Sequence, residues 1–153
     1  MYLMIVSLKF LRGIFLANKT LAILGRPNVG KSTLFNRLLG SRKSIVSPIE
    51  GVTRDRVYST FDWVGYNFDI IDTGGFLPKE KDIMSRHIQE QARIAINEAD
   101  LIIFLVDGRS EITASDRILA DMVIRSQKSS ILVVNKIDTL EQTELINEFF
   151  ELG

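Results

Sequence analysis

Residues 25–32 read Gly25-Arg26-Pro27-Asn28-Val29-Gly30-Lys31-Ser32 and match the spacing G-x-x-x-x-G-K-[ST]. An apolar run at 20–24 precedes them, and the apolar residues of 33–39 have helical spacing. Gly25 and Gly30 allow a tight turn whose backbone N–H groups point inward, and the dipole of the following helix adds positive potential. The pattern therefore predicts a strand, an anion-binding loop and a helix, in that order.

Side chains of this loop have expected partners in a nucleoside triphosphate. The amine of Lys31 would reach the β- and γ-phosphates, and the hydroxyl of Ser32 would bind Mg²⁺. We include Thr33 with residues 25–32 as nucleotide contacts. The alternative is a strand-to-helix turn that binds nothing, but a lysine and a hydroxyl just inside a helix add little stability that Ala or Leu would not.

The composition is that of one globular domain. The chain has 153 residues, of which 46% are hydrophobic and 25% charged, unlike a disordered or fibrous protein. Its 19 basic and 19 acidic residues balance, so the totals do not indicate nucleic acid or a membrane as a partner. The absence of cysteine excludes disulfides and cysteine-ligated metal and fits a reducing compartment, so we expect a cytoplasmic protein.

Strands and helices are expected to alternate along residues 19–153. Two strand-like runs are separated only by residues 64–65, which predicts an antiparallel hairpin. The order predicts an α/β fold of the P-loop NTPase type, a doubly wound, mostly parallel sheet with ligands at the carboxyl ends of its strands. His87, the single histidine, is expected at the solvent side or boundary of a helix and is not proposed as a ligand. The expected strands are 20–24, 57–63, 66–71, 101–106 and 130–134, and the expected helices are 33–39, 82–98, 114–125 and 141–152.

Two further segments are expected near the γ-phosphate. One follows a strand and reads Asp72-Thr73-Gly74-Gly75. Asp72 would touch the Mg²⁺ shell through water, and the Gly75 N–H would bond the γ-phosphate. Thr53 lies in the long loop 41–56, where its hydroxyl and carbonyl would reach Mg²⁺ and the γ-phosphate. Residues 41–56 and 74–81 would be switch segments ordered by a triphosphate, although each motif alone fits an ordinary turn or loop.

Residues Asn135-Lys136-Ile137-Asp138 follow a buried strand and are expected to select the base. A carboxylate at Asp138 can accept hydrogen bonds from N1–H and the exocyclic amine of guanine, whereas adenine would present an acceptor to it. The stem of Lys136 would lie along the base, and Asn135 would tie this segment to the phosphate loop. The alternative is the start of a helix with Asp138 as its cap.

Together these motifs resemble the GTPase domains of the Era, MnmE and Der (EngA) group, above all the first GTPase domain of the Der family. The resemblance covers about residues 20–153 and implies a GTPase that requires Mg²⁺ and acts in assembly of the large ribosomal subunit. The catalytic residues that it implies are Lys31, Thr53 and Gly75. It rests on GRPNVGKSTLF (25–35), GVTRDR (51–56), DTGGF (72–76), ADLIIFLVDG (99–108) and NKID (135–138).

The resemblance also implies slow hydrolysis that K⁺ stimulates. Phe76 stands where Ras-like proteins have a glutamine that orients the attacking water, and a phenyl ring cannot hydrogen-bond water. In this group a K⁺ ion beside the phosphates supplies positive charge, and Asn28 matches the asparagine that helps to bind it. Pro48-Ile49-Glu50 departs from the usual Thr-Pro pair of the K⁺-enclosing loop.

The resemblance implies an N-terminal fragment of such a GTPase, with 19–153 forming a GTPase domain that is incomplete at the C-terminus. The family has a Ser-Ala loop, one further strand and a final helix after this point, so one sheet edge and one helix face would lie uncovered. Residues 1–18 are apolar but interrupted by Lys9 and Arg12. We expect them to form an extension outside the domain, the alternative being a weak membrane- or partner-binding segment.

The leading function is thus a slow, K⁺-stimulated GTPase that binds GTP and GDP. The alternatives are a guanine-nucleotide-binding module without useful turnover, an Era- or MnmE-type GTPase domain, and a fragment whose function lies in other domains. The large ribosomal subunit or its rRNA is the expected partner, met through domains outside this chain. A membrane is not expected, and the oligomeric state is left open.

Overall fold

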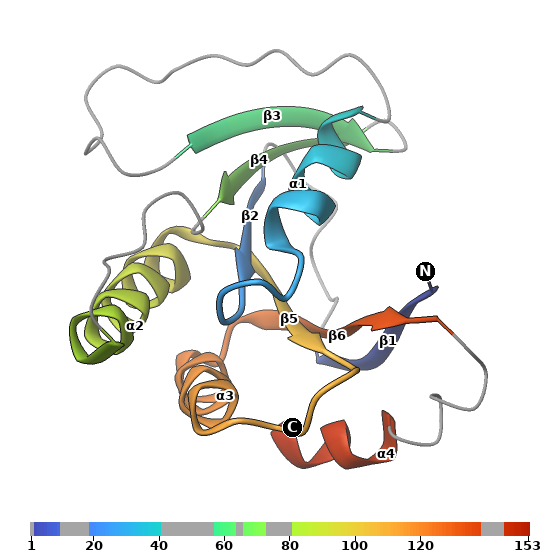
Figure 1. Ribbon diagram of the computed structural model, residues 1–153. Coiled ribbons are helices and arrows are strands. Elements are labelled where there is room, and N and C mark those ends of the chain that lie inside the picture. Colours follow the sequence, from blue (N-terminus) through green and yellow to red (C-terminus); the bar gives the residue numbers. More distant parts are fainter. Residues whose placement is uncertain (1, 10–18, 41–56, 64–65, 73–80, 139–145) are drawn as a thin grey trace.

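A computed structural model describes residues 2–9, 19–40, 57–63, 66–72, 81–138 and 146–153 of the chain (Figure 1). They form a six-stranded sheet with helices on both faces. The strands are β1 (Tyr2–Lys9), β2 (Lys19–Leu24), β3 (Val57–Trp63), β4 (Tyr66–Asp72), β5 (Leu101–Asp107) and β6 (Ser129–Ile137). The helices are α1 (Lys31–Gly40), α2 (Lys81–Glu98), α3 (Ala114–Ser126) and α4 (Ile146–Phe149), followed by the 3-10 turn η2 (Phe150–Leu152).

The strands lie in the order β1-β6-β5-β2-β4-β3. β2 pairs in parallel with β4 and β5, β5 pairs in parallel with β6, and β3 pairs antiparallel with β4. These pairings confirm the predicted doubly wound, mostly parallel sheet with one antiparallel hairpin strand. Because parallel strands end at the same edge of a sheet, the loops that follow β2, β5 and β6 meet there. In the register, Asp72 lies beside Ile23, and Asp107 lies beside Asn135.

Most element boundaries agree with the sequence-based expectation, and two differ from it. β6 runs to Ile137 instead of stopping near residue 134, because β5 pairs with it as far as Asn135 and β1 as far as Ile137. The helix predicted for 141–152 is described only from residue 146, where α4 and η2 follow each other. Residues 139–145 of that prediction lie outside the described residues.

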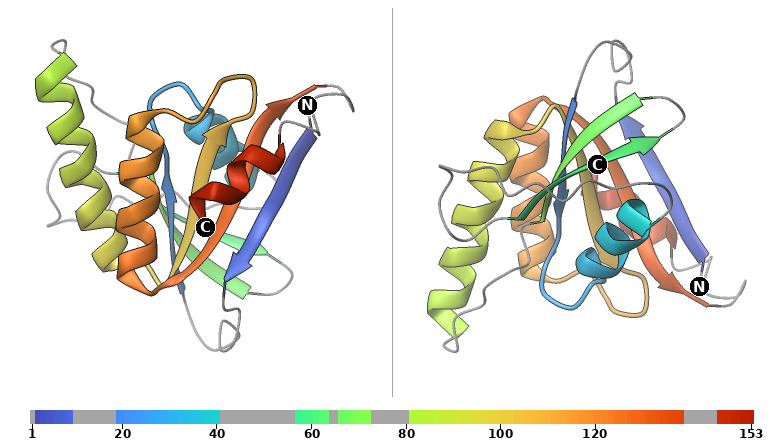
Figure 2. Two further views of the ribbon diagram at one scale, coloured as in Figure 1. Left: turned by 90° about the horizontal axis from the view of Figure 1, so that it is seen from below. Right: turned by 90° about the horizontal axis from the view of Figure 1, so that it is seen from above.

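Two apolar cores lie on opposite faces of the sheet. In β2, Ala22 and Leu24 belong to the core beneath α2, α3 and α4, whereas Leu21 and Ile23 belong to the core beneath α1. Figure 2 shows the same division, with α1 on one face and the other helices on the opposite face. The central strands are buried on both faces, which is why their sequences are continuously apolar.

The amino-terminal segment is part of the sheet, contrary to the expectation of an extension outside the domain. Tyr2–Lys9 forms strand β1, which pairs antiparallel with β6 from Tyr2 beside Ile137 to Lys9 beside Ser130. The expectation that this sheet edge is uncovered is therefore also wrong, because β1 covers it. The pairing joins segments more than a hundred residues apart, and no local pattern in the sequence reports such a contact.

Deletion of residues 1–9 tests the role of β1. We expect the melting temperature to fall by at least about 5 °C and the mean mass in solution to rise, because β6 would expose a long apolar edge. Circular dichroism and light scattering would measure both quantities. A control that replaces residues 2–9 with a Gly-Ser segment of equal length separates strand pairing from chain length. Unchanged melting and mass in both variants would contradict the assignment.

Candidate functional site

The loop between β2 and α1 has the tight shape that its two glycines predict. Gly30 has φ of +105°, and a Cβ atom there would overlap Nδ2 of Asn135. A Cβ atom on Gly25 would overlap the carbonyl oxygen of Leu105 in the neighbouring strand β5. Only glycine therefore lets the loop approach β5 and β6 this closely.

Lys31 begins α1 and folds its side chain back across this loop. It is only 8% exposed, and its Nζ donates hydrogen bonds to the carbonyl oxygens of Gly25 and Arg26, both at 2.8 Å. A buried ammonium group is stabilised by negative charge nearby, so this position favours an anion in the loop. The phosphate-binding role expected for Lys31 stays a prediction.

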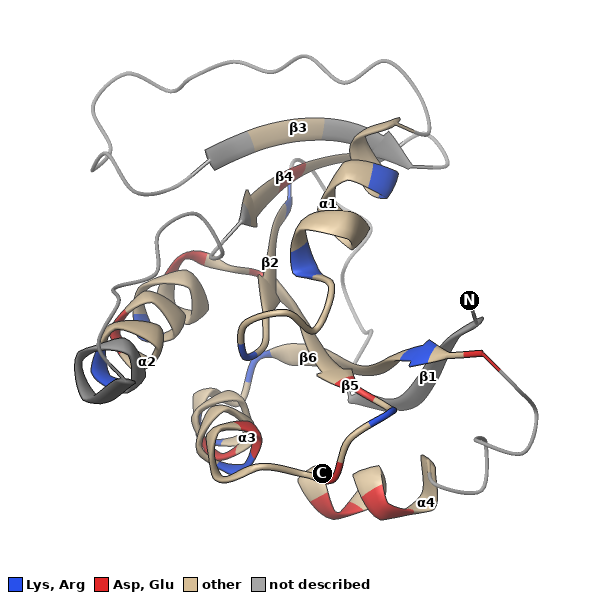
Figure 3. Ribbon diagram, viewed as in Figure 1, with Lys and Arg blue, Asp and Glu red and all other residues tan. Residues whose placement is uncertain are grey.

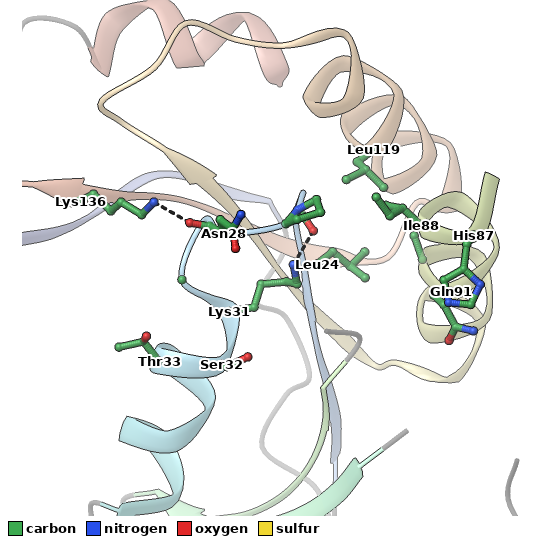
Figure 4. A pocket seen from close by; sticks show the side chains of 14 residues that line it. Leu24, Asn28, Lys31, Ser32, Thr33, His87, Ile88, Gln91, Leu119 and Lys136 are labelled. Atoms are coloured by element: carbon green, nitrogen blue, oxygen red, sulfur yellow. Dashed lines mark hydrogen bonds between the residues drawn. The ribbon is translucent and has the colours of Figure 1, made fainter. Parts of the chain in front are cut away.

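A cavity of about 380 Å³ opens in front of the loop. Leu24 and eight of the predicted nucleotide contacts line it: Gly25, Pro27, Asn28, Gly30, Lys31, Ser32, Thr33 and Lys136. Its opposite wall comes from His87, Ile88, Gln91 and Ala92 of α2 and from Leu119 of α3. Figure 4 shows His87 and Gln91 together on that wall, across the cavity from the loop.

His87 and Gln91 were not proposed as site residues from the sequence. Their separation of four residues places them on one face of α2, next to Ile88 and Ala92, which pack against the core. The four-residue spacing was the sequence signal that could have placed these two residues on a common face. The sequence did not show that this face of α2 turns toward the loop after β2.

Two side chains at the end of β6 hold the phosphate loop. Nδ2 of Asn135 donates to the carbonyl of Val29 at 2.8 Å, which confirms the predicted tie between the two segments. Nζ of Lys136 donates to the carbonyl of Asn28 at 2.5 Å. Asn28 and Lys136 have left-handed backbones, with φ of 65° and 66°. Such conformations in residues other than glycine gather at functional sites, where surrounding contacts hold them.

Asp107, at the end of β5, completes this junction. Its carboxylate accepts hydrogen bonds from Nζ of Lys136 at 2.7 Å and from the backbone N–H of Arg109 at 3.1 Å. Burial by itself would raise the pKa of Asp107, but these bonds and the charge of Lys136 outweigh it and lower the pKa. Figure 3 shows basic and acidic residues close together at the ends of β5 and β6.

Asp138 lies at the end of β6 and is 40% exposed. Its carboxylate forms an ion pair with the guanidinium of Arg109, from the turn after β5. Nε of Arg109 also donates to the carbonyl of Lys136 at 3.1 Å. Arg109 is a neighbour of Asp138 that the sequence did not predict, and the alternative of a helix cap at Asp138 concerns residues 139–145, which lie outside the described residues.

One buried acceptor in the junction has no protein partner. Oδ1 of Asn135 is inaccessible to solvent, and no hydrogen bond to it exists within the described part of the chain. Buried polar atoms are rarely left unpaired in native proteins. The unpaired oxygen is consistent with a hydrogen-bond donor supplied by a ligand or by residues outside the described ranges.

Arg26 connects the phosphate loop to the start of α3. Its Nε lies 3.3 Å from a carboxylate oxygen of Asp116, which is only 2% exposed, and its guanidinium also donates to the hydroxyl of Ser110. Asp116 simultaneously forms a capping box with Thr113 at the amino terminus of α3. One buried carboxylate thus caps the helix start and lies beside the loop residue, although Nε of Arg26 makes no hydrogen bond within the described residues.

Several predicted site residues lie outside the described residues. These include Thr53 with loop 41–56, Phe76, and the segment 73–80 that contains Thr73, Gly74 and Gly75. The backbone of Asp72 is placed at the end of β4, beside β2. In the described ranges, no three histidine, cysteine or carboxylate side chains gather as a metal site. None of the helices described combines the length and the apolar character needed to span a bilayer.

Comparisons with known proteins agree with this geometry. Residues 20–136 match the family model described as 50S ribosome-binding GTPase. The chain is 54% identical over 132 residues to GTPase Der of Clostridium kluyveri and 50% identical over 134 residues to GTPase Der of Caldicellulosiruptor saccharolyticus. These matches cover 86% and 88% of this chain but only 30% of each relative.

A solved structure of an Aquifex aeolicus Era variant bound to GDP and AlF4⁻ is also similar. Its TM-score is 0.67 at 34% identity, over 89% of this chain and 48% of the Era chain.

Substitution of Asp116 by alanine tests the link between the loop and α3. We expect the free energy of unfolding to fall by about 2–4 kcal/mol, because the variant loses the Asp116 half of the capping box and leaves a partly buried guanidinium without its ion pair. Urea denaturation followed by circular dichroism measures the change. The matched control is Asp121→Ala on the same helix, whose exposed pair with Arg125 contributes little. Equal denaturation midpoints for the two variants would contradict the structural role of Asp116.

Proposed function

Because this chain belongs to the family of 50S ribosome-binding GTPases, we propose that it binds guanine nucleotides and hydrolyses GTP to GDP and phosphate. The observation that carries the proposal is the junction between the phosphate loop and the end of β6. Asn135 and Lys136 donate to Val29 and Asn28, so the residues proposed for phosphate and those proposed for the base are hydrogen-bonded to each other.

The phosphate half of the proposed site is the loop 25–32 with Thr33. Its backbone N–H groups, the amine of Lys31 and the amino terminus of α1 would hold the β- and γ-phosphates. Lys31 is the catalytic residue with the most direct structural support, since its buried Nζ already lies against the loop carbonyls. Thr53 and Gly75 complete the proposed catalytic set, through contacts with the γ-phosphate.

The base half of the proposed site is Asn135, Lys136 and Asp138. The carboxylate of Asp138 would accept hydrogen bonds from N1–H and the exocyclic amine of guanine. Adenine has no hydrogen on N1, so an adenine nucleotide would leave the carboxylate facing an acceptor. The stem of Lys136, which its two hydrogen bonds hold in place, would lie along the base.

The donor set of the site fits Mg²⁺ held mainly by phosphate oxygens. Mg²⁺ prefers six oxygen ligands, retains several waters and is usually bound by one or two protein groups plus substrate phosphates. The hydroxyl of Ser32, which lines the cavity, would be one of those groups. Thr53 and, through water, Asp72 would be the others. When bound, Mg²⁺ would neutralise charge that develops on the phosphate oxygens.

Hydrolysis is proposed to depend on K⁺. Phe76 cannot orient the attacking water, so additional positive charge beside the phosphates would be needed in the transition state. Asn28 is exposed, lines the cavity and has a left-handed backbone. Its side-chain oxygen would be a K⁺ ligand.

The proposed partner is the large ribosomal subunit or its rRNA. The name of the matched family supports this assignment. The chain spans about 30% of the length of the curated relatives. The proposal therefore assigns nucleotide binding to this domain and the ribosomal contact to a longer protein of the same kind.

Calorimetry with GDP, GTP and ATP tests nucleotide binding. In the presence of Mg²⁺ and K⁺, we expect the two guanine nucleotides to bind and ATP not to bind. Asp138→Asn should weaken GDP about 10- to 100-fold, because a hydrogen bond to a charged group contributes about 1.5–3 kcal/mol. Asp121→Asn, on the exposed face of α3, is the control and should bind normally. Equal affinities for GDP and ATP would contradict the assignment.

Single-turnover release of phosphate from GTP tests the role of K⁺. We expect K⁺ to accelerate release at least about tenfold over Na⁺ at equal ionic strength. Asn28→Gly keeps the left-handed backbone but removes the side chain, so it should abolish the K⁺ effect while leaving GDP affinity nearly unchanged. Equal rates in the two salts would refute K⁺ dependence, and absence of release with intact binding would indicate a module without turnover.

A further inference from the structure

The turn that follows β5 is fixed against the end of β6. The backbone N–H of Gly108 donates to the carbonyl of Asn135 at 2.8 Å, and the N–H of Arg109 donates to Asp107 at 3.1 Å. The backbone of Arg109 is therefore held at a defined position beside the segment proposed to select the base.

From that position the Arg109 side chain makes two contacts with this segment. Its Nε donates to the backbone carbonyl of Lys136 at 3.1 Å, and a terminal nitrogen pairs with Oδ2 of Asp138. The planar guanidinium carries both donors in a fixed geometry. One side chain thus links the orientation of the Asp138 carboxylate to the left-handed backbone at Lys136.

Fold stability does not account for this arrangement. The side chains of Arg109 and Asp138 are 54% and 40% exposed, and ion pairs at such positions contribute little to stability. The guanine edge would approach the same carboxylate with two donors, N1–H and the exocyclic amine, so the orientation of that carboxylate decides whether both can bond.

We propose that Arg109 is a specificity-determining positioning residue, which holds the carboxylate of Asp138 in the orientation that accepts both N1–H and the exocyclic amine of guanine. The inference rests on the proposed function, because it assigns a role within the same guanine site. Arg109 acts through Asp138 and does not touch the reacting phosphates. If Arg109 instead competed with guanine for Asp138, the changes in nucleotide affinity described below would have the opposite sign.

Affinities for GDP and IDP separate the two relations. Hypoxanthine, the base of IDP, lacks the exocyclic amine of guanine, so the ratio of GDP to IDP affinity measures the contact between that amine and Asp138. We expect the original chain to prefer GDP about tenfold or more, as one charge-assisted hydrogen bond implies. Arg109→Ala should weaken GDP about 5- to 20-fold and IDP less, so that the ratio falls toward one. Arg109→Lys, which supplies one donor group in place of the fork, should give an intermediate ratio.

The matched control is Arg117→Ala, which removes another exposed arginine that pairs with a carboxylate, Glu151. It should leave both affinities and their ratio unchanged, and the melting temperatures of all variants should be compared. A parallel loss of GDP and IDP binding, an unchanged ratio, or a gain in GDP affinity in Arg109→Ala would overturn the inference. Failure of the original chain to bind GDP would instead overturn the proposed function, so the two failures are distinguishable.

Discussion

The hydrogen bond from the Asn135 side chain to the Val29 carbonyl is the constraint on which the site depends. It joins the ends of two strands that are not neighbours, since β5 lies between β2 and β6. The contact requires glycine at position 30, because any Cβ atom there would overlap the Asn135 amide. The loop proposed to bind phosphate and the segment proposed to bind the base are therefore joined directly by this hydrogen bond. The sheet sets the distance between these two segments, and the buried side-chain amide of Asn135 joins them.

Charged side chains near this contact link the phosphate loop and the end of β6 to further segments. Lys136 connects Asn28 to Asp107, and the turn that begins at Asp107 presents Arg109 to Asp138. On another side of the loop, Arg26 reaches the buried Asp116 at the start of α3. Each partner is placed by a strand end or a helix start, so the regular elements of the fold position the site. Helices α2 and α3, which pack on one face of the same sheet, form the opposite wall of the cavity.

The parts of the site that could be predicted from the sequence are those that local spacing encodes. The phosphate loop is a continuous pattern between an apolar strand and an amphipathic helix, and the hairpin has a two-residue connection. Even the tie from Asn135 followed from the position of its motif after a buried strand. Arg109 and Asp138 are 29 residues apart, and Arg26 and Asp116 are also distant, so neither pairing has a local signature. β1 was missed for the same reason, because its partner strand lies at the opposite end of the chain.

The most direct test of this account is the binding of GDP and of pyrophosphate to Asn135→Ala, measured by calorimetry beside the melting temperature. Pyrophosphate would contact only the phosphate loop, whereas Asn135 belongs to the segment proposed for the base. If the amide fastens the two halves together, the variant should stay folded and lose affinity for both ligands, with GDP weakened about 100-fold or more. A variant that loses GDP affinity but binds pyrophosphate as the original chain does would contradict the account, because the phosphate loop would then be shaped without Asn135.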